Sequence, residues 1–473
     1  MTWLLLIGIP VTGALAVLLT QVASRASTVL LMSAAVTSVV ATVLAVLPAG
    51  APLLAGYLRG DATVQLFAPV INFIFAGIAV YVRARVASEP ASRRFVSLAL
   101  AFLAASNLAL LSNQLLLMWL AIECTTLAAA LLIVRGDAPA SRLASWRYLL
   151  FSSVGLGLVL LGLLCLTRSM ELAGRGATLF LDAMPAAVAT PTDAWRDLGV
   201  GLVVLGVATK LGLAPMYSWL PEAYDEAPAP VTAMLGAVQF NCALVLLFRV
   251  VHIYRPGSKG LITGELLAIG LISVAVSTAS LVATRNVKRL LSYASINHAG
   301  VIAIGLGLGD SASYGLLLYV LSNAFIKAIL FLTAGKIEAH YGTKDTREIV
   351  GLIKDLPYSG LFLMIGTFAL LGFPPFGSFL GELLILSALV TSGQLFVFAT
   401  FCVLITVSFV ATGRTIFPMI WAAPRQTRTW PQQRLLDALH KLLFLVLLLV
   451  LGIYIPPQVN SLITDVARSL GGA

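Results

Sequence analysis

The sequence predicts an all-α polytopic membrane protein of about fourteen transmembrane helices, arranged as two inverted repeats that each contain a broken helix. Three observations predict this class. The 473 residues are 59% hydrophobic and only 11% charged, which leaves too little polar surface to cover a water-soluble globule. Apolar runs of roughly 18 to 25 residues recur along the whole chain, and each could cross the bilayer as a helix. A short proline-containing motif also occurs twice, about five spans apart.

The predicted spans follow one another along the whole chain. They are centred near residues 11, 38, 73, 103, 124, 157, 208, 239, 274, 298, 324, 372, 407 and 449. The first apolar run, from Trp3 to about Thr20, has no basic leader region and no obvious cleavage site, so we expect a retained helix rather than a signal peptide. The seventh and twelfth spans contain prolines, and we expect both to be interrupted.

Basic residues indicate how the chain is oriented. Alternate crossings gather most lysines and arginines on one side, in the loops 83–94, 135–147, 285–289, 336–354 and 425–441. By the positive-inside rule this side is cytoplasmic, which leaves both termini on the outer side of a bacterial or archaeal cell (inner) membrane. Orientation therefore explains the net charge of +10, and we expect no nucleic-acid partner.

Two smaller features concern cofactors and the membrane surface. The four cysteines, Cys124, Cys165, Cys242 and Cys402, are scattered singly, without the spacing of a disulfide, an iron–sulfur cluster or a zinc site, so we expect no cofactor in this chain. The segment 422–441 has basic residues beside Trp430, as in an interfacial connector on the cytoplasmic leaflet. A plain loop explains this segment nearly as well.

The repeated motif is P-x-x-S-aromatic-L. It reads PMYSWL at 215–220, near the seventh span, and PFGSFL at 375–380, near the twelfth. An odd offset of five spans means that the two copies enter the membrane from opposite sides, as in an inverted-topology repeat. The expected helix breakers are Pro215, Pro221, Pro374 and Pro375.

Five ionisable residues lie inside apolar segments: Glu123, Lys210, His298, Lys327 and Glu382. An ionised group at mid-bilayer costs about 2.5 to 3.5 kcal/mol on insertion scales, so such groups are expected to face protein or a water-filled cavity. The alternatives are packing carboxylates, lysines that reach the interface and a hydrogen-bonded packing histidine. Asn241, Asn323 and Lys336 are possible secondary members, whereas Lys288, Arg289 and Lys336 at helix ends are expected to anchor the chain at the cytoplasmic surface.

The prolines near Lys210 predict water beside that lysine. Pro215 and Pro221 leave backbone carbonyls unpaired, and hydrocarbon does not tolerate them unless protein or water satisfies them. The proton affinity of a buried lysine depends on a neighbouring carboxylate such as Glu123, so movement of that partner could load or release a proton. We expect a mid-membrane relay that runs through Glu123, Lys210, Lys327 and Glu382, with His298 and water between them.

These same stretches carry a family resemblance. The segments WLAIECTTLAAALL, KLGLAPMYSWLPEAYDEAPAPVTAML, VKRLLSYASINHAGVIAIGLG, NAFIKAILFLTAGKIEAHYGT and GFPPFGSFLGELLIL resemble the proton-translocating antiporter-like subunits of respiratory complex I, Mrp-type cation/proton antiporters and membrane-bound hydrogenases. Within that family, IECTTLAAALL, YASINHAG and YGTKD are most similar to component F of hydrogenase-4 and formate hydrogenlyase type complexes. The resemblance covers roughly residues 95–390.

The resemblance implies an organisation and residue roles. It implies N-terminal helices over 1–94, a five-helix repeat over 95–255, an inverted repeat over 256–421, and a connector with a last helix over 422–473. Glu123 and Lys210 would be the paired charges of one half-channel, Lys327 the central lysine, and Glu382 the broken-helix charge of the other half. Many relatives have a histidine or lysine in the eighth span, where this chain has Gly236, Gln239 and Asn241. The closest group commonly has a carboxylate where Asn297 stands.

The function expected from these observations is proton movement, with sodium as an alternative ion, driven by a redox or other energy-converting partner. Expected partners are other integral membrane subunits, peripheral iron–sulfur or metal-centre subunits of the same complex, and the lipid bilayer. The chain itself would be a non-redox subunit of an oxidoreductase complex. The alternatives are an Mrp-like cation/proton antiporter subunit, a subunit for proton-coupled inorganic carbon uptake, and a scaffold that has lost transport.

Overall fold

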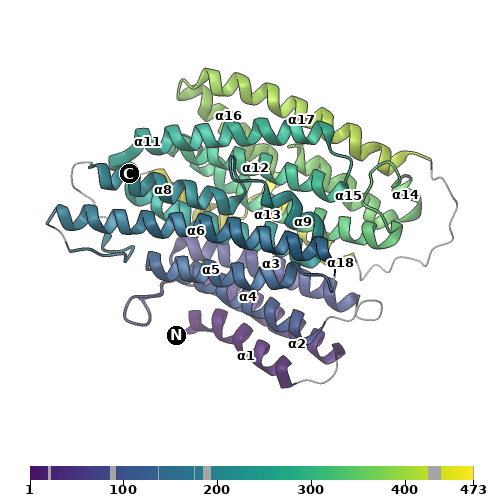
Figure 1. Cartoon of the computed structure of the whole chain (residues 1–473), viewed down its shortest axis with the longest axis horizontal. Coiled ribbons are helices and arrows are strands. Elements are labelled where there is room, and N and C mark those ends of the chain that lie inside the picture. Colours follow the sequence, from purple (N-terminus) through teal and green to yellow (C-terminus); the bar gives the residue numbers. More distant parts are fainter. Residues whose placement is uncertain are drawn as a thin grey trace.

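A computed structural model describes residues 1–19, 23–48, 50–85, 92–136, 138–174, 176–184, 193–423 and 438–471. Within these residues the regular structure is helical, and most helices run side by side in one bundle (Figure 1). The all-α class predicted from composition and apolar runs is confirmed. The predicted connector at 422–441 lies mostly outside the described residues, which omit 424–437.

The first half of the described chain supplies the helices α1 (Leu5–Leu19), α2 (Ala23–Ala45), α3 (Ala62–Ala84), α4 (Arg93–Leu111), α5 (Leu115–Ile133), α6 (Pro139–Leu172), α8 (Ala194–Leu211) and α9 (Trp219–Glu226). After α9 come α10 (Ala229–Ala233), a π-helical segment (Met234–Gln239) and α11 (Phe240–Ala283). Helix α11 is kinked at Ser258, whose backbone leaves the helical region.

The second half supplies α12 (Val287–Leu308), α13 (Asp310–Tyr341), α14 (Leu352–Asp355), α15 (Pro357–Leu370), α16 (Gly377–Thr391), α17 (Leu395–Trp421), α18 (Leu439–Ile453) and α19 (Pro457–Gly471). The last two helices are bent by 72° relative to each other. Figure 1 shows both chain ends at the same end of the bundle.

Eleven helices of the described chain are long and apolar enough to cross a membrane, or up to twelve if α18 and α19 form one broken span. The predicted number of about fourteen is larger because interrupted spans do not meet this test as single helices. Helix α8 contains three charged residues, Arg196, Asp197 and Lys210, and α15 and α16 are only 14 and 15 residues long. The chain is therefore a multi-span membrane protein with several short helices inside the bundle.

Glycine and proline interrupt the chain after α8 and after α15. Gly212 (φ 74°) and Gly372 (φ 67°) lie in the left-handed region, which ends each helix without strain. Pro215 lies in the segment between α8 and α9, and Pro374 and Pro375 lie in the segment between α15 and α16. Pro221 lies instead in the first turn of α9, where a missing N–H is tolerated, so it does not break the helix.

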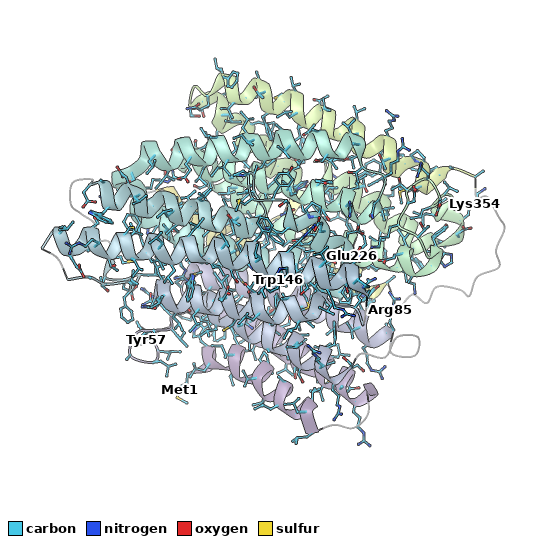
Figure 2. All side chains as sticks on the ribbon, viewed as in Figure 1. Met1, Tyr57, Arg85, Trp146, Glu226 and Lys354 are labelled. Atoms are coloured by element: carbon cyan, nitrogen blue, oxygen red, sulfur yellow. The ribbon has the colours of Figure 1, made fainter. Side chains whose placement is uncertain are left out.

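The most buried helices lie in the middle of the bundle. The most apolar parts of Ala229–Ser258 and of α13 are wholly buried, and that of α12 is 94% buried. By contrast, the most apolar parts of the first helix and of α17 are only 28% buried. Met1 and Tyr57 lie at one end of the bundle, and Arg85, Glu226 and Lys354 lie toward the other (Figure 2). The central helices also carry polar side chains, so the candidate site lies away from lipid.

Candidate functional site

Lys210 lies in the last turn of α8, next to the first interruption. Its side chain is buried, and its ammonium donates hydrogen bonds to the hydroxyl of Thr126 at 2.7 Å and to that of Tyr148 at 3.1 Å. The ammonium also lies 4.8 Å from the centre of the Tyr148 ring. Because neutral hydroxyls from α5 and α6 surround this charge, its environment can stabilise either a charged or a neutral lysine.

Glu123 belongs to the same group of helices but does not pair directly with Lys210. One carboxylate oxygen accepts a hydrogen bond from Ser153 at 2.9 Å. The other is buried and has no hydrogen-bond partner among the described residues. Thr126, one turn further along α5, is the residue that contacts the lysine. The structure thus places the predicted pair in one group of helices, with separate hydrogen-bond partners for the two charges.

A hydrogen-bonded chain leads from Lys210 toward the centre of the bundle. The hydroxyl of Tyr148 donates to the amide oxygen of Gln239 at 2.8 Å, and the amide nitrogen of Gln239 donates to Thr125 at 2.8 Å. Gln239 is the last residue of the π-helical segment. The sequence had marked Gln239 as a departure from its relatives, but nothing in it singled out Tyr148.

Lys327 is the second buried lysine, and it lies in the middle of α13. Its ammonium is 3.8 Å from the centre of the Phe240 ring and has no hydrogen-bond partner in the described part of the chain. The stem of this lysine packs beside Gly236, where an added Cβ would lie 3.6 Å from the Lys327 Cδ atom. The segment therefore lies near both lysines: Gln239 bonds to the Tyr148 that contacts Lys210, whereas Gly236 and Phe240 pack beside Lys327.

His298 links α12 to the second interruption. Its Nε2 lies 3.0 Å from the carbonyl oxygen of Leu370, the last residue of α15. A carbonyl only accepts, so Nε2 carries a proton, and Nδ1 is the free acceptor of the neutral ring. Nδ1 and the side-chain oxygen of Asn323 are both buried and without a hydrogen-bond partner among the residues described here. Tyr319 stacks on the imidazole at 5.3 Å.

Glu382 lies next to this histidine, at a small cavity beside the second interruption. The cavity has a volume of about 30 Å³, and its lining includes Glu382, His298 and Asn297. This volume accommodates about one water molecule. An added Cβ on Gly372 would lie 2.7 Å from a Glu382 carboxylate oxygen, so a larger residue there would displace the carboxylate. Asn297 donates to the hydroxyl of Ser408 at 3.1 Å.

The secondary residues are placed differently. Asn241 donates to the carbonyl of Ala237 one turn earlier at 2.7 Å, so its amide nitrogen bonds back to the π-helical segment. Asn323 lies one turn before Lys327, and its side chain lies beside His298. Lys336 is half-buried near the end of α13. Of these three residues, Asn323 is the one that the structure brings to the central groups.

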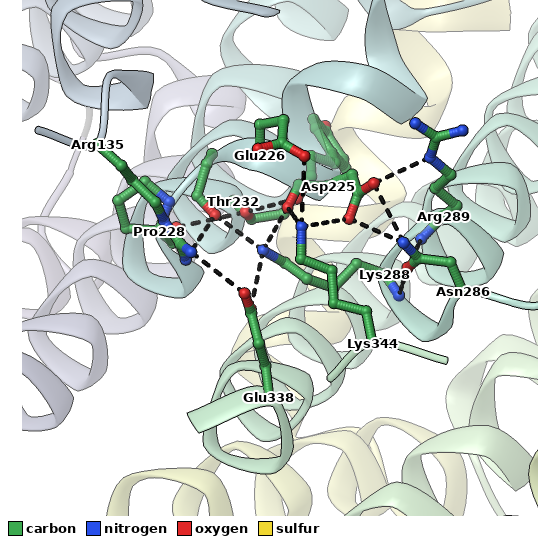
Figure 3. Close-up of polar contacts among 12 residues, drawn as sticks. Arg135, Asp225, Glu226, Pro228, Thr232, Asn286, Lys288, Arg289, Glu338 and Lys344 are labelled. Carbon is green, nitrogen blue, oxygen red and sulfur yellow. Dashed lines mark hydrogen bonds and ion pairs between the residues drawn. The ribbon is translucent and has the colours of Figure 1, made fainter. Parts of the chain in front are cut away.

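One expectation about surface anchors is wrong. Lys288 was expected to anchor the chain at the cytoplasmic surface, yet its side chain is fully buried. It lies among the carbonyls at the end of α9 and the carboxylate of Glu338 (Figure 3). Its neighbour Arg289 is half exposed and pairs with Asp225 at 2.9 Å. The sequence shows only that Lys288 begins a helix, whereas its burial depends on α9 and α13, which are distant in sequence.

Buried lysines and partly buried carboxylates beside two interrupted helices, in a bundle of membrane-spanning helices, define an antiporter-like membrane subunit. The family of NADH:quinone oxidoreductase/Mrp antiporter transmembrane proteins matches residues 112–408, and the chain belongs to this family. It is 32% identical over 378 residues to the hydrogenase-4 component F homolog of Methylacidiphilum infernorum (isolate V4), which covers 79% of this chain and 78% of that protein.

Solved structures share the fold. A chain of the membrane-bound sulfane sulfur reductase, an archaeal respiratory membrane complex, superposes with a TM-score of 0.87 at 24% identity, over 99% of this chain and 98% of that one. A chain of the Mrp complex from Dietzia sp. DQ12-45-1b gives a TM-score of 0.86 at 19% identity, over 99% and 97%. The family resemblance predicted from the sequence motifs is confirmed.

Proposed function

We propose that this chain translocates protons as a membrane subunit of a multi-subunit energy-converting complex of the hydrogenase-4/formate hydrogenlyase or complex I type. The single observation that carries this proposal is the environment of Lys210. A buried ammonium next to a helix interruption, held by the hydroxyls of Thr126 and Tyr148, can exchange its proton along hydrogen bonds. The match to the component F homolog favours the hydrogenase-4 type.

In this proposal protons pass between two groups of side chains. The first holds Glu123 and Lys210, and the second holds Lys327, His298 and Glu382. Gln239 and the π-helical segment lie between the two groups. The amide of Gln239 does not itself take up a proton and can only join hydrogen bonds, so the path past this segment has to be completed by water. Within the second group, the cavity beside Glu382 has room for a water of its own.

The proposal includes fourteen spans and two inverted repeats. Pairing α8 with α9 and α15 with α16 gives two broken spans, each with a left-handed glycine and a proline in the interruption. The repeats would run from 95 to 255 and from 256 to 421, after helices at 1–94 and before a connector and last helix at 422–473. Both termini would be on the outer side of a bacterial or archaeal cell (inner) membrane.

The partners follow from the complexes in which the relatives occur. The structural neighbours are chains of an archaeal respiratory membrane complex and of an Mrp complex, so we propose other integral membrane subunits as direct partners. Peripheral iron–sulfur or metal-centre subunits would supply the energy, because this chain is proposed to have no cofactor of its own. Proton-coupled transport without redox chemistry, as in an antiporter or carbon-uptake subunit, is the alternative, and neighbouring genes discriminate between the two.

The test uses the intact complex, purified through a tag on this chain and reconstituted into liposomes. A potassium diffusion potential set with valinomycin drives proton flux, which pyranine trapped in the lumen reports. We expect flux in the parent complex and none in Lys210→Met, with equal amounts of assembled protein. Equal flux in both would overturn the proposal, as would a parent complex that conducts no protons. Mass spectrometry of the same preparation identifies the partner subunits.

A further inference from the structure

Lys288 is a fully buried charge that the proposed relay does not use. Its ammonium lies 2.7 Å from the carbonyl oxygen of Asp225, 2.9 Å from that of Ala227 and 3.2 Å from a carboxylate oxygen of Glu338. An ammonium has three protons to donate, and each has an acceptor here. Because each of its three protons has an acceptor, this lysine is suited to hold a structure in place rather than to pass a proton on.

Three cations from different elements converge on the end of α9. The Ala227 carbonyl also accepts from Arg135, in the loop between α5 and α6, at 3.2 Å. The Asp225 carbonyl also accepts from Lys344, which follows α13, at 3.0 Å. A helix C-terminus has unpaired carbonyls and a partial negative charge, which cations stabilise. We call Arg135, Lys288, Glu338 and Lys344, together with these carbonyls, the α9 clamp (Figure 3).

Glu338 ties the clamp together. One of its oxygens is 3.2 Å from Lys288 and the other is 3.2 Å from Arg135. The Arg135 side faces a cavity of about 770 Å³ that Glu338 also lines, whereas Lys288 is fully buried. The clamp therefore has one arm that lines a cavity, at Arg135, and one buried arm, at Lys288, whose charge is screened less by solvent.

The opposite end of α9 contacts the Lys210 site. The indole nitrogen of Trp219, the first residue of α9, donates to the carbonyl of Thr209 at 3.0 Å, and Thr209 immediately precedes Lys210. The Trp219 ring also packs edge-on against the ring of Tyr148, with centres 5.3 Å apart. Helix α9 has eight residues and thus spans about 12 Å, so it forms a short rigid connection between the clamp and the hydrogen bonds of Lys210.

We propose that the α9 clamp is a positioning device for the proton site at Lys210, and that Glu338 and Lys288 are positioning residues that act on this lysine through α9. This inference rests on the proposed function. Glu338 lies on α13, which also carries Lys327, and Lys288 lies on α12, which also carries His298. A rearrangement of either helix when its own site gains or loses a proton would therefore reach Lys210 through the clamp.

The readout is the pH dependence of proton flux, because the groups around Lys210 determine when it holds a proton. The titratable groups that face Lys210 are Glu123 of α5 and Tyr148 of α6. Tyr224 of α9 lies behind Tyr148, and Glu265 of α11 lies beside Gly201, earlier on α8. Loss of the clamp would let α9 move and weaken the hydrogen bonds that the ammonium donates. The charged form of Lys210 would then be less stable, and half-maximal flux would move to lower pH.

The experiment measures flux against pH in the reconstituted complex, with the amount of assembled complex determined in parallel. In Glu338→Gln we expect half-maximal flux to move to lower pH by about one unit. Lys344→Gln removes a more exposed arm and should cause a smaller shift in the same direction. Glu171→Gln removes a surface ion pair of α6 with more than half of each side chain exposed, and should leave the profile unchanged.

The outcomes separate this inference from the proposed function. If Lys210→Met abolishes flux but Glu338→Gln and Lys344→Gln assemble and keep the parent pH profile, the clamp does not position Lys210 and this inference is overturned while the proposed function stands. If both clamp variants fail to assemble, the clamp only holds the fold together, and the inference is overturned as well. If Lys210→Met conducts like the parent, the proposed function itself fails.

Discussion

Lys210 and Glu123 lie in one cluster of side chains without touching each other. Lys210 donates to Thr126 and Tyr148, whereas Glu123 accepts from Ser153. A direct ion pair would hold both charges fixed, since separating buried partners is costly. Because each has its own hydrogen-bond partners, either group can change its charge while the hydrogen bonds of the other persist. The predictions below test the parts of this arrangement.

The first prediction concerns the hydroxyl of Tyr148. Tyr148→Phe keeps the ring and removes the group that accepts from Lys210 and donates to Gln239. We expect proton flux to fall about tenfold, since losing these hydrogen bonds costs about 1 to 1.5 kcal/mol. Flux in liposomes measures this effect, and thermal denaturation of the purified complex shows whether the fold is intact. Undiminished flux would remove Tyr148 from the path.

The second prediction concerns the need for Lys210 to lose its proton. Lys210→Arg keeps a positive charge and hydrogen-bond donors, but a guanidinium does not deprotonate at accessible pH. We expect the complex to assemble and its flux to fall to the level of Lys210→Met. Pyranine fluorescence under an imposed potential measures the flux. If Lys210→Arg conducts like the parent complex, the lysine serves only as a fixed charge.

The third prediction concerns Gln239 at the end of the π-helical segment. Gln239→Leu has a similar volume but breaks the link from Tyr148 to Thr125, so we expect flux to fall at least about tenfold. Gln239→His retains one donor and one acceptor and should keep most of the flux. The comparison of the two variants isolates hydrogen bonding from packing. Flux at the level of the parent complex in both variants would show that the path bypasses this residue.

The fourth prediction concerns Glu382 at its small cavity. Glu382→Gln preserves size and removes the ionisable group, so we expect flux to fall about tenfold or more. Glu171→Gln is the matched control, because Glu171 is an exposed carboxylate on α6 that pairs with the exposed Arg168 one turn earlier. Flux and assembly are measured for both variants. A similar effect in both would mean that the cavity plays no special role.

The fifth prediction concerns Asp345, in the loop after α13. Hydrogen bonds from the side chain and backbone of Arg347 lower the pKa of this carboxyl to about 2. A carboxyl whose pKa is lowered on folding stabilises the protein at every pH above its unfolded-state pKa, near 3.8. This contribution is lost only as the pH falls toward 2. Asp345→Asn should therefore lower the melting temperature of the purified complex equally at pH 5 and pH 8. A difference between the two would mean that Asp345 titrates in this range.

Most helices could be predicted because an apolar run of bilayer length has few alternatives. The predicted centres near 103, 124, 298 and 324 lie inside α4, α5, α12 and α13. The predicted spans near 239 and 274 are separated only by a kink at Ser258, with no loop between them. The kink and the π-helical segment depend on packing between helices that are distant in sequence, which apolar periodicity does not report.

The ionisable residues of the candidate site could also be singled out, because a charge inside an apolar run is costly and therefore conspicuous. Their hydrogen-bond partners could not. Tyr148, Thr126 and Gln239 are ordinary residues for such helices, and only the arrangement of α5, α6 and the π-helical segment gives them a role. Lys288 shows the opposite error, since its place at a helix end suggested the surface although α9 and α13 cover it.

The burial of α13 has a consequence for how the chain enters the bilayer during synthesis. This helix carries Lys327 at its middle yet is long and apolar enough to cross a membrane. Each leucine, isoleucine or phenylalanine near the lysine contributes about 0.3 to 0.6 kcal/mol toward insertion, which together offset the cost of one ammonium. The translocon can thus release α13 into lipid as an independent segment, before its neighbours arrive to cover it.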